Sequence, residues 1–254
     1  MSLPDGFIPV LTFHDISDSS SPWCLPPRTF RRLTGWLADE GFRALTMSEL
    51  AVHYDAARRQ HGRAVALTFD DGRAGVYEHA RETLARHGMR ATIYAVSGWA
   101  HGAPLPPGEA YSGVMDLAGL RALAGDGHEI GYHSSDHRCY LTRTDDELRH
   151  DLTTARAALE RGTGVEIRHF SYPYGHFDPR TERLVSEHGN FDTVVTSTRE
   201  IRPDPRRHPR ISVKAGLRAR DFPRLLAPET WQPLAPVLCR HRRPPGQERA
   251  ADVG

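Results

Sequence analysis

Residues 66–72 read Ala-Leu-Thr-Phe-Asp-Asp-Gly, and this stretch indicates both the fold and the chemistry of the chain. Four residues suited to a buried strand are followed by two adjacent carboxylates, Asp70 and Asp71, and then by Gly72. Two acids side by side repel each other, so the end of a buried strand is an unfavourable place for them. An acidic pair before glycine can be a simple turn in which one aspartate caps the following helix. The alternative is a functional site at the end of a strand.

Short apolar runs alternate with helical patterns along the chain. Strands are expected at residues 7–13, 64–69, 91–96, 129–132, 166–172, 193–196 and 211–213. Helices are expected at residues 29–40, from 46, at 76–87, at 116–124, at 144–159 and from 178. This alternation predicts a parallel α/β architecture, and seven or eight strand–helix steps in one domain imply a closed or nearly closed barrel.

The length of 254 residues suits one large domain better than two small ones. We expect that domain, the catalytic one if the chain is an enzyme, to occupy residues 1–235. Residues 236–254 are rich in Arg, Pro, Gly and Ala and are expected to be a disordered tail. Residues 97–113 are rich in Gly and Pro and are expected to form an ordered loop or lid.

The composition of the chain indicates which binding partners and which cellular compartment to expect. A net charge of +1 gives no reason to expect nucleic acid or an anionic membrane as partner. The three cysteines, Cys24, Cys139 and Cys239, are too widely spaced for a thiolate zinc site or a disulfide framework. The first residues lack the basic and apolar segments of a signal peptide, and no apolar run is as long as a membrane span. We therefore expect a cytoplasmic protein.

Polar side chains follow several of the expected strands at the end where each strand stops. They form four groups: His14-Asp15, Asp70-Asp71, His133 with His137, and Tyr172-Pro173-Tyr174-Gly175. Active groups of α/β barrels lie at the carboxyl ends of the strands. The coincidence of four groups at such ends therefore favours a site over a turn.

His133 and His137 are four residues apart, a spacing that lets two imidazoles reach one metal ion from one turn of helix. With 15 histidines in the chain, about one such pair arises by chance, so two exposed loop histidines are the alternative. A strand-end aspartate added to this pair makes a three-ligand metal site with open positions, as catalysis requires. The neighbouring aspartate would then be free to act as a general base on water.

Longer segments of the sequence resemble one known family. "TFDDG" at residues 68–72 and "GHEIGYHSSDH" at residues 127–137 resemble the first two motifs of the polysaccharide deacetylases, also called the NodB homology domain or carbohydrate esterase family four. "VLTFHDI" at 10–16, the helix and strand at 30–50, and "FSYPYG" at 170–175 resemble the branch that acts on biofilm polysaccharides. The resemblance covers most of the chain and implies an α/β fold, a distorted (β/α)7–8 barrel.

The resemblance assigns a role to each matching position. It places a divalent metal ion on Asp71, His133 and His137, the general base on Asp70, the general acid on His14, and an oxyanion-binding N–H on the backbone of Tyr174. His14 is chosen because the usual late histidine motif is absent and the first-strand histidine serves as acid in this branch. Zinc is the expected metal, and cobalt, nickel or iron would also suit these ligands.

One motif departs from the family pattern. Ser171 occupies the position of the arginine that ordinarily tethers the catalytic aspartate, and Arg210 is the candidate replacement. Tyr172 and Trp99 are candidate substrate-binding residues, because aromatic faces pack on sugar rings. Arg210 is a third candidate. Burial in the core is an equally good expectation for Tyr172 and Trp99.

The resulting hypothesis is a metal-dependent amide hydrolase. Its substrate would be an N-acylated amino sugar or a glycosylated small molecule from which an acetyl or similar small acyl group is removed. The alternatives are a deacetylase of a polymeric glycan, a non-catalytic carbohydrate-binding member of the fold, and an iron oxygenase with a two-histidine, one-carboxylate site. The expected partner is a small molecule or oligosaccharide, with neither nucleic acid nor membrane, and the oligomeric state is left open.

Overall fold

The computed structural model describes residues 7–53, 63–197 and 206–227. The tail predicted at residues 236–254 lies outside the described residues, as does the domain boundary at residue 235. No described helix has the length and apolar character needed to cross a membrane.

The strands observed agree with the alternation expected from the sequence, and several short ones are added. They are β1 (Val10–Phe13), β2 (Asp15–Ile16), β3 (Cys24–Leu25), β4 (Arg43–Leu45), β5 (Ala64–Phe69), β6 (Thr92–Ala95), β7 (Glu129–Tyr132), β8 (His169–Ser171), β9 (Thr193–Val195), β10 (Arg207–His208) and β11 (Ile211–Ser212). The bounds of β5 and β7 are those predicted, whereas β1 and β8 are shorter. Strands β2, β3 and β10 have only two residues, too few for a periodic pattern.

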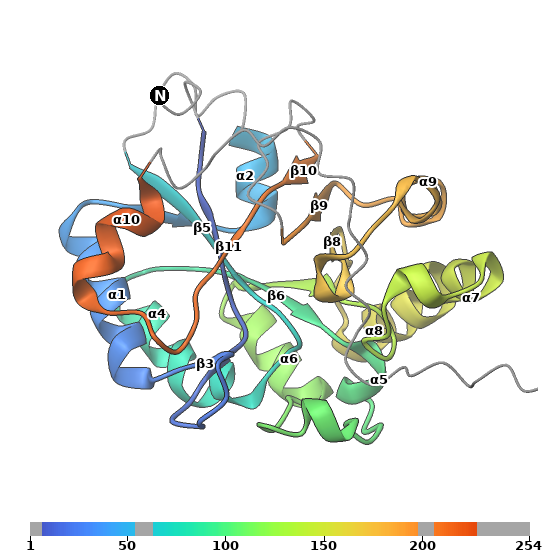
Figure 1. The fold of residues 1–254 in the computed structure, drawn as a ribbon, viewed down its shortest axis with the longest axis horizontal. Helices are drawn as coiled ribbons and strands as arrows, with labels where there is room; N and C mark the ends of the chain where they lie inside the picture. Colours follow the sequence, from blue (N-terminus) through green and yellow to red (C-terminus); the bar gives the residue numbers. More distant parts are fainter. Residues whose placement is uncertain (1–6, 54–62, 198–205, 228–254) are drawn as a thin grey trace, which may run out of the picture.

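The helices follow the strands in the predicted alternation. They are α1 (Pro27–Asp39), α2 (Met47–His53), α4 (Arg81–Arg86), α5 (Ser97–Ala100), α6 (Leu117–Gly125), α7 (Asp145–His150), α8 (Arg156–Thr163), α9 (Pro179–His188) and α10 (Phe222–Leu226). A single π turn precedes α4 at Val76–Ala80, and another joins α7 to α8 at Asp151–Ala155. The helices surround the strands, and α10 (orange) lies beside α1 (blue), where the rings of Trp36 and Phe222 are 5.9 Å apart (Figure 1).

Local sequence signals account for where helices begin. Thr144 and Glu147 form a capping box at the start of α7, in which each side chain accepts a hydrogen bond from the other residue's backbone N–H. Thr46 and Glu49 do the same at the start of α2. Asp178 caps α9 by accepting from the N–H of Thr181, with proline at the first helical position.

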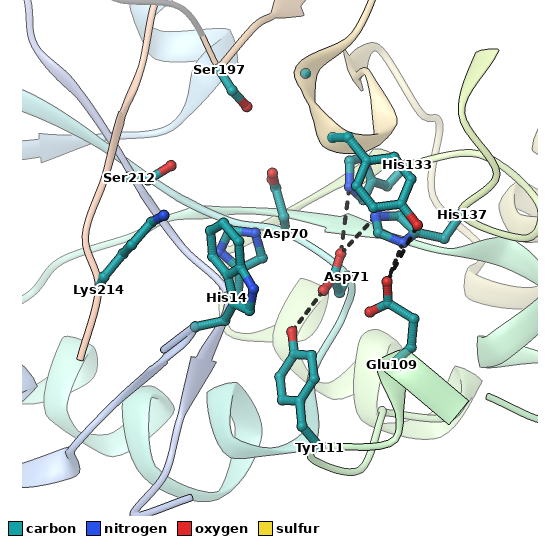
Figure 2. A pocket seen from close by; sticks show the side chains of 14 residues that line it. His14, Asp70, Asp71, Glu109, Tyr111, His133, His137, Ser197, Ser212 and Lys214 are labelled. Carbon is teal, nitrogen blue, oxygen red and sulfur yellow. Dashed lines mark hydrogen bonds and ion pairs between the residues drawn. The ribbon is translucent and has the colours of Figure 1, made fainter. Parts of the chain in front are cut away.

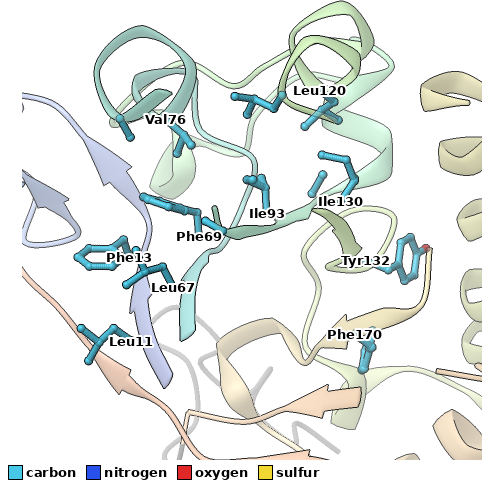
Figure 3. Packing of buried hydrophobic residues seen from close by; sticks show 14 of the residues in the cluster. Leu11, Phe13, Leu67, Phe69, Val76, Ile93, Leu120, Ile130, Tyr132 and Phe170 are labelled. Carbon is cyan, nitrogen blue, oxygen red and sulfur yellow. The ribbon is translucent and has the colours of Figure 1, made fainter. Parts of the chain in front are cut away.

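Strand β5 lies at the centre of a parallel sheet that curls into a half-barrel. Within the described residues the sheet has nine strands in the order β10-β9-β8-β7-β6-β5-β1-β11, and β4 also pairs with β5. Leu67 and Phe69 of β5 pack against the surrounding helices with Phe13 and Ile93 (Figure 3). The alternating residue Thr68 faces inward, where its hydroxyl lies 3.0 Å from that of Thr12.

The two edge strands, β10 and β11, are adjacent in sequence but do not pair with each other in the part of the chain described. Only Pro209 and Arg210 lie between them, so the chain crosses from one edge of the half-barrel to the other within two residues. The expected closed or nearly closed barrel is thus open at this seam. Arg210 at the seam is buried, with 1% of its surface exposed.

A second, two-stranded sheet, β2 with β3, holds the end of β1 against the first helix after β5. The N–H of Gly75 donates to Asp15 Oδ1 at 3.0 Å, so Asp15 has a local structural contact. A β-carbon added at Gly75 would lie 2.4 Å from that oxygen and 2.4 Å from the carbonyl oxygen of Ile16. Only glycine therefore allows this close approach, which places His14 beside the end of β5.

Gly75→Ala is expected to lower the free energy of unfolding by about 1–3 kcal/mol, because the new methyl group must displace the backbone of β2. Gly35→Ala in α1 is the matched control, since nothing lies within 4 Å of its added β-carbon. That control should raise the free energy of unfolding by about 0.5–1 kcal/mol through helix propensity. Urea unfolding measures both, and equal stability of the Gly75 variant and the wild type would contradict the close contact.

Candidate metal centre and active-site pocket

A pocket with a volume of about 290 Å³ opens at the carboxyl ends of the strands. His14, Asp70, Asp71, His133 and His137 all line it, so the structure brings together residues that are up to 123 positions apart in the sequence. Figure 2 shows Asp71 directed at the two histidines, with His14 on the other side of the aspartates.

Asp71, His133 and His137 form a compact group of three side chains. Asp71 Oδ1 lies 3.5 Å from Nε2 of His133 and 3.4 Å from Nε2 of His137. One ligand atom from each of the three lies within 4.8 Å of the others, and all three residues are buried. The three side chains that the sequence proposes as metal ligands therefore converge on one point.

The hydrogen bonds around this group fit a bound cation. His133 Nδ1 lies 2.7 Å from the carbonyl oxygen of Ser171, and His137 Nδ1 lies 3.1 Å from Glu109 Oε1. Each imidazole is thus oriented through Nδ1, which leaves Nε2 as the lone-pair donor. Within the described residues, Asp71 Oδ1 is buried with no hydrogen-bond partner. An unpartnered carboxylate oxygen between two Nε2 atoms is what a divalent cation would satisfy.

Burial and neighbouring charges set the protonation of the three groups. Burial lowers the pKa of His133 to about 4, so this imidazole is neutral at pH 7. Burial also acts to lower the pKa of His137, but the carboxylates of Asp71 and Glu109 outweigh it and raise the value. For Asp71, burial acts to raise the pKa, and the neighbouring positive groups, His137 foremost, hold it well below its ordinary range. A proton on His137 would compete with a cation, so cation binding should weaken as pH falls.

The backbone around the site is in sparsely populated conformations. Asp71 (φ 72°), Ser134 (φ 72°), His137 (φ 60°) and Tyr174 (φ 59°) are four of the five described non-glycine residues with positive φ. Such strain persists where surrounding contacts enforce it and is concentrated at functional sites. It also corrects one prediction: residues 133–137 form an irregular turn, so the two histidines do not project from one turn of helix.

The second oxygen of Asp71 is held by residues that the sequence did not single out. Asp71 Oδ2 accepts from Arg73 Nη2 at 2.9 Å and from Tyr111 Oη at 3.2 Å. Arg73 also binds Glu109 at 2.6 Å, and Glu109 in turn orients His137. Glu109 and Tyr111 belong to the Gly/Pro-rich segment 97–113, which is ordered as expected. Nothing in the local sequence identifies which polar side chains of such a loop reach the site.

Asp70 is held by Arg210. Arg210 Nη1 donates to Asp70 Oδ1 at 2.8 Å and Nη2 to Oδ2 at 2.7 Å, a two-point contact. Ser171 Oγ lies 2.9 Å from Arg210 Nη2. Ser171 thus stands where the family motif has an arginine, and the guanidinium of Arg210 reaches the aspartate from another strand end. Burial acts to raise the pKa of Asp70, but Arg210 and His133 hold it below its ordinary value. Asp70 is therefore an ionised, oriented carboxylate.

His14 lies across the pocket from the two metal-site histidines (Figure 2). Its ring is 4.6 Å from that of Trp23, and among the described residues its buried Nδ1 has no hydrogen-bond partner. Burial lowers the pKa of His14, and the carboxylates of Asp71 and Asp70 act in the opposite direction. His208 lies in β10 and is absent from the lining of this pocket, so it is no alternative to His14 as the acid.

Tyr174 lines the pocket at the end of β8. Its ring lies 4.6 Å from that of His137, and its hydroxyl is 3.4 Å from Glu109 Oε1. The side chain is 51% exposed, so it forms part of the rim. The oxyanion role assigned to its backbone N–H stays a prediction.

The three residues proposed to bind substrate are placed elsewhere. Tyr172 is buried in the core and stacks on Phe177, with ring centroids 5.3 Å apart. Trp99 is 4% exposed and packs behind His137, at 5.3 Å between rings. Arg210 is buried and bound to Asp70. None of the three lines the pocket: Tyr172 and Trp99 follow the alternative expectation of core burial, and Arg210 follows the expectation that it replaces the arginine that tethers the catalytic aspartate.

Comparison with known sequences points to one family. The family described as polysaccharide deacetylase matches residues 57–191, more than half of the chain. The chain is 23% identical over 189 residues to the provisionally named polysaccharide deacetylase YxkH of Bacillus subtilis, covering 74% of this chain and 64% of that protein. It is 29% identical over 144 residues to a chitooligosaccharide deacetylase of Azorhizobium caulinodans, covering 55% of this chain and 62% of that protein. The chain thus spans less than two thirds of the length of these relatives.

Solved structures share the fold. Streptococcus pyogenes deacetylase PplD, determined in complex with acetate, has a TM-score of 0.76 at 18% identity, covering 87% of this chain and 98% of that one. IcaB from Ammonifex degensii has a TM-score of 0.73 at 24% identity, covering 91% and 99%. Identities this low establish the common architecture alone, a curled parallel sheet with outer helices. Together with the sequence match, they show that the chain belongs to the polysaccharide deacetylase family.

Proposed function

We propose that the chain is a metal-dependent N-deacetylase that removes an acetyl or similar small acyl group from an N-acylated amino sugar or a glycosylated small molecule. The proposal rests on the different surroundings of the two adjacent aspartates, Asp70 and Asp71, at the end of β5. Asp71 faces two histidine Nε2 atoms, while the adjacent Asp70 is held ionised by Arg210. A metal-dependent amide hydrolase needs a cation site with a base beside it, whereas a sugar-binding protein does not need the base.

The cation would be held by Asp71, His133 and His137, with zinc as the first candidate and cobalt, nickel or iron as alternatives. When bound, it supplies Lewis acidity to the amide carbonyl and to a water molecule. Asp70 takes a proton from the attacking water, whose oxygen adds to the carbonyl carbon. The N–H of Tyr174 stabilises the negative charge that develops on the carbonyl oxygen.

His14 completes the reaction from the opposite wall. The C–N bond breaks when the nitrogen takes a proton from His14, which gives a free amine and a small carboxylic acid. His14 and Asp70 lie on the same pocket but are separate groups, so acid and base need not be one residue. The pocket volume of about 290 Å³ is at the lower end of ligand sites, which supports one sugar ring as the bound unit.

The Asp70→Asn variant tests the role of Asp70 as base independently of metal binding. We expect this variant to retain a divalent cation but to lose about 100-fold or more in kcat, because an amide cannot accept the proton. His133→Ala removes a ligand and should lose both the cation and turnover. Metal content by mass spectrometry and acetate release from an N-acetyl amino sugar measure the two effects. Near-normal turnover by Asp70→Asn would remove Asp70 from the role of base.

Arg210→Met tests Arg210 as a positioning residue. Without the guanidinium, burial dominates and the pKa of Asp70 rises, so the carboxylate is protonated at a higher pH than in the wild type. The acidic limb of kcat/KM should therefore move to higher pH, by about one pH unit or more. Arg210→Lys keeps the charge and should shift the limb less. If the acidic limb of kcat/KM were unchanged in Arg210→Met, the group that titrates in that limb would not be Asp70.

His14→Ala tests the acid. A protonated His14 is required, so activity should fall as pH rises through its pKa, which burial lowers relative to an exposed histidine. The alkaline limb of kcat/KM should lie at correspondingly lower pH and vanish in His14→Ala. An alkaline limb that persists in the variant would assign the acid to another group.

A further inference from the structure

Lys214 occupies the wall of the pocket opposite the two metal-site histidines. It is the only lysine in the chain, and the other residues in the Lys+Arg total of 33 are arginines. Figure 2 shows Lys214 with Ser197 and Ser212 on the side away from His133 and His137. The reaction proposed above uses none of these three polar side chains.

The backbone at Lys214 is held on both sides. The N–H of Val213 donates to the carbonyl of Thr12 at 2.8 Å, which continues the pairing of β11 with β1. The N–H of Ala215 donates to the carbonyl of Pro22 at 3.1 Å. The segment is therefore tied to β1 on one side and to the loop before β3 on the other, and the exposed side chain of Lys214 extends from this anchored backbone.

Among the residues that the structure describes, no acid neutralises the ammonium group of Lys214. Asp70 pairs with Arg210, while Asp71 and Glu109 share the guanidinium of Arg73. In the described ranges no carboxylate lies within ion-pair distance of the lysine. A cation in a ligand pocket with no acidic partner among the described residues favours an anionic ligand group.

The position of the cation indicates which end of the substrate it would meet. The Lys214 ammonium lies 4.0 Å from the centre of the Trp23 ring, and that ring lies 4.6 Å from His14. His14 is the proposed donor to the leaving amine, so the sugar that carries the amine extends from His14 past Trp23. The acyl group, at the metal site, lies in the opposite direction.

We infer that Lys214, with the hydroxyls of Ser197 and Ser212, forms a subsite for an anionic substituent on the amino sugar, a phosphate or a carboxylate. One ammonium and two hydroxyl donors suit either group through charge-assisted hydrogen bonds. The inference rests on the proposed function and names its substrate class: an N-acyl amino sugar that bears a negative charge. A neutral N-acetyl sugar would leave this subsite unused.

Kinetics with three probes test the subsite: N-acetylglucosamine, its 1-phosphate, and N-acetylmuramic acid, which carries a carboxylate. The readout is the ratio of kcat/KM for a charged probe to kcat/KM for the neutral one. Lys214→Met should lower that ratio about tenfold, mainly through KM, because one charge-assisted hydrogen bond is lost. Lys214→Arg should retain most of the ratio. Arg32→Met is the matched control, since it removes an exposed cation of α1 outside the pocket.

A binding measurement separates this inference from the proposed function. Reductive methylation with ¹³C-formaldehyde labels the single lysine while keeping its charge, and Lys214→Met identifies its NMR signal. The charged probes should shift that signal at concentrations where the neutral probe does not. A response to one charged probe alone identifies the anion as phosphate or carboxylate.

The outcomes are distinguishable. A selective shift without acetate release from any probe would keep the anion subsite and overturn the deacetylase. Acetate release with a ratio that Lys214→Met leaves unchanged would keep the deacetylase and overturn the subsite. Equal NMR shifts with neutral and charged probes would also overturn it.

Discussion

The buried ion pair between Asp70 and Arg210 is the contact on which the site depends. It joins the end of the central strand β5 to the seam between the two edge strands, across 140 residues of sequence. Both side chains are almost fully buried, and each has two hydrogen bonds to the other. Removing either partner would leave an uncompensated buried charge. The same pair that fastens the open side of the half-barrel thus keeps one carboxylate ionised inside it.

Adjacent acids receive different tasks because the backbone turns between them. Asp70 continues the inward-facing side of β5, whereas Asp71 and Gly72 both have positive φ. This left-handed step directs Asp71 to the histidines and leaves Asp70 to Arg210. Each carboxylate then has its own positive partner, so the mutual repulsion of neighbouring charges is offset without protonating either. A divalent cation at Asp71 would offset it further.

The pocket has two chemically different walls. One is built from strand ends and the Gly/Pro-rich loop, where Glu109 and Arg73 hold the metal-site side chains in place. The other carries Lys214 above the Trp23 ring, next to His14. A substrate between them would place its acyl group at the first wall and its amine at the second. In the proposed reaction, the first wall would hold the reacting groups, and the second would determine which amino sugar is accepted.

The sequence by itself determined the elements whose signals are local. The bounds of β5 and β7, the capped starts of α7 and α9, and the group of Asp71, His133 and His137 followed from apolar periodicity, capping residues and motifs. The tertiary structure confirmed that Arg210, the candidate from the sequence, binds Asp70, and it alone decided that Glu109 orients His137 and that Tyr172 and Trp99 are buried. Propensity and patterning act over a few residues, whereas these contacts depend on the order of strands in the sheet and on where loops return. For that reason the local sequence around Arg210 could not show whether its side chain is buried or contacts substrate. The fold shows that it is buried.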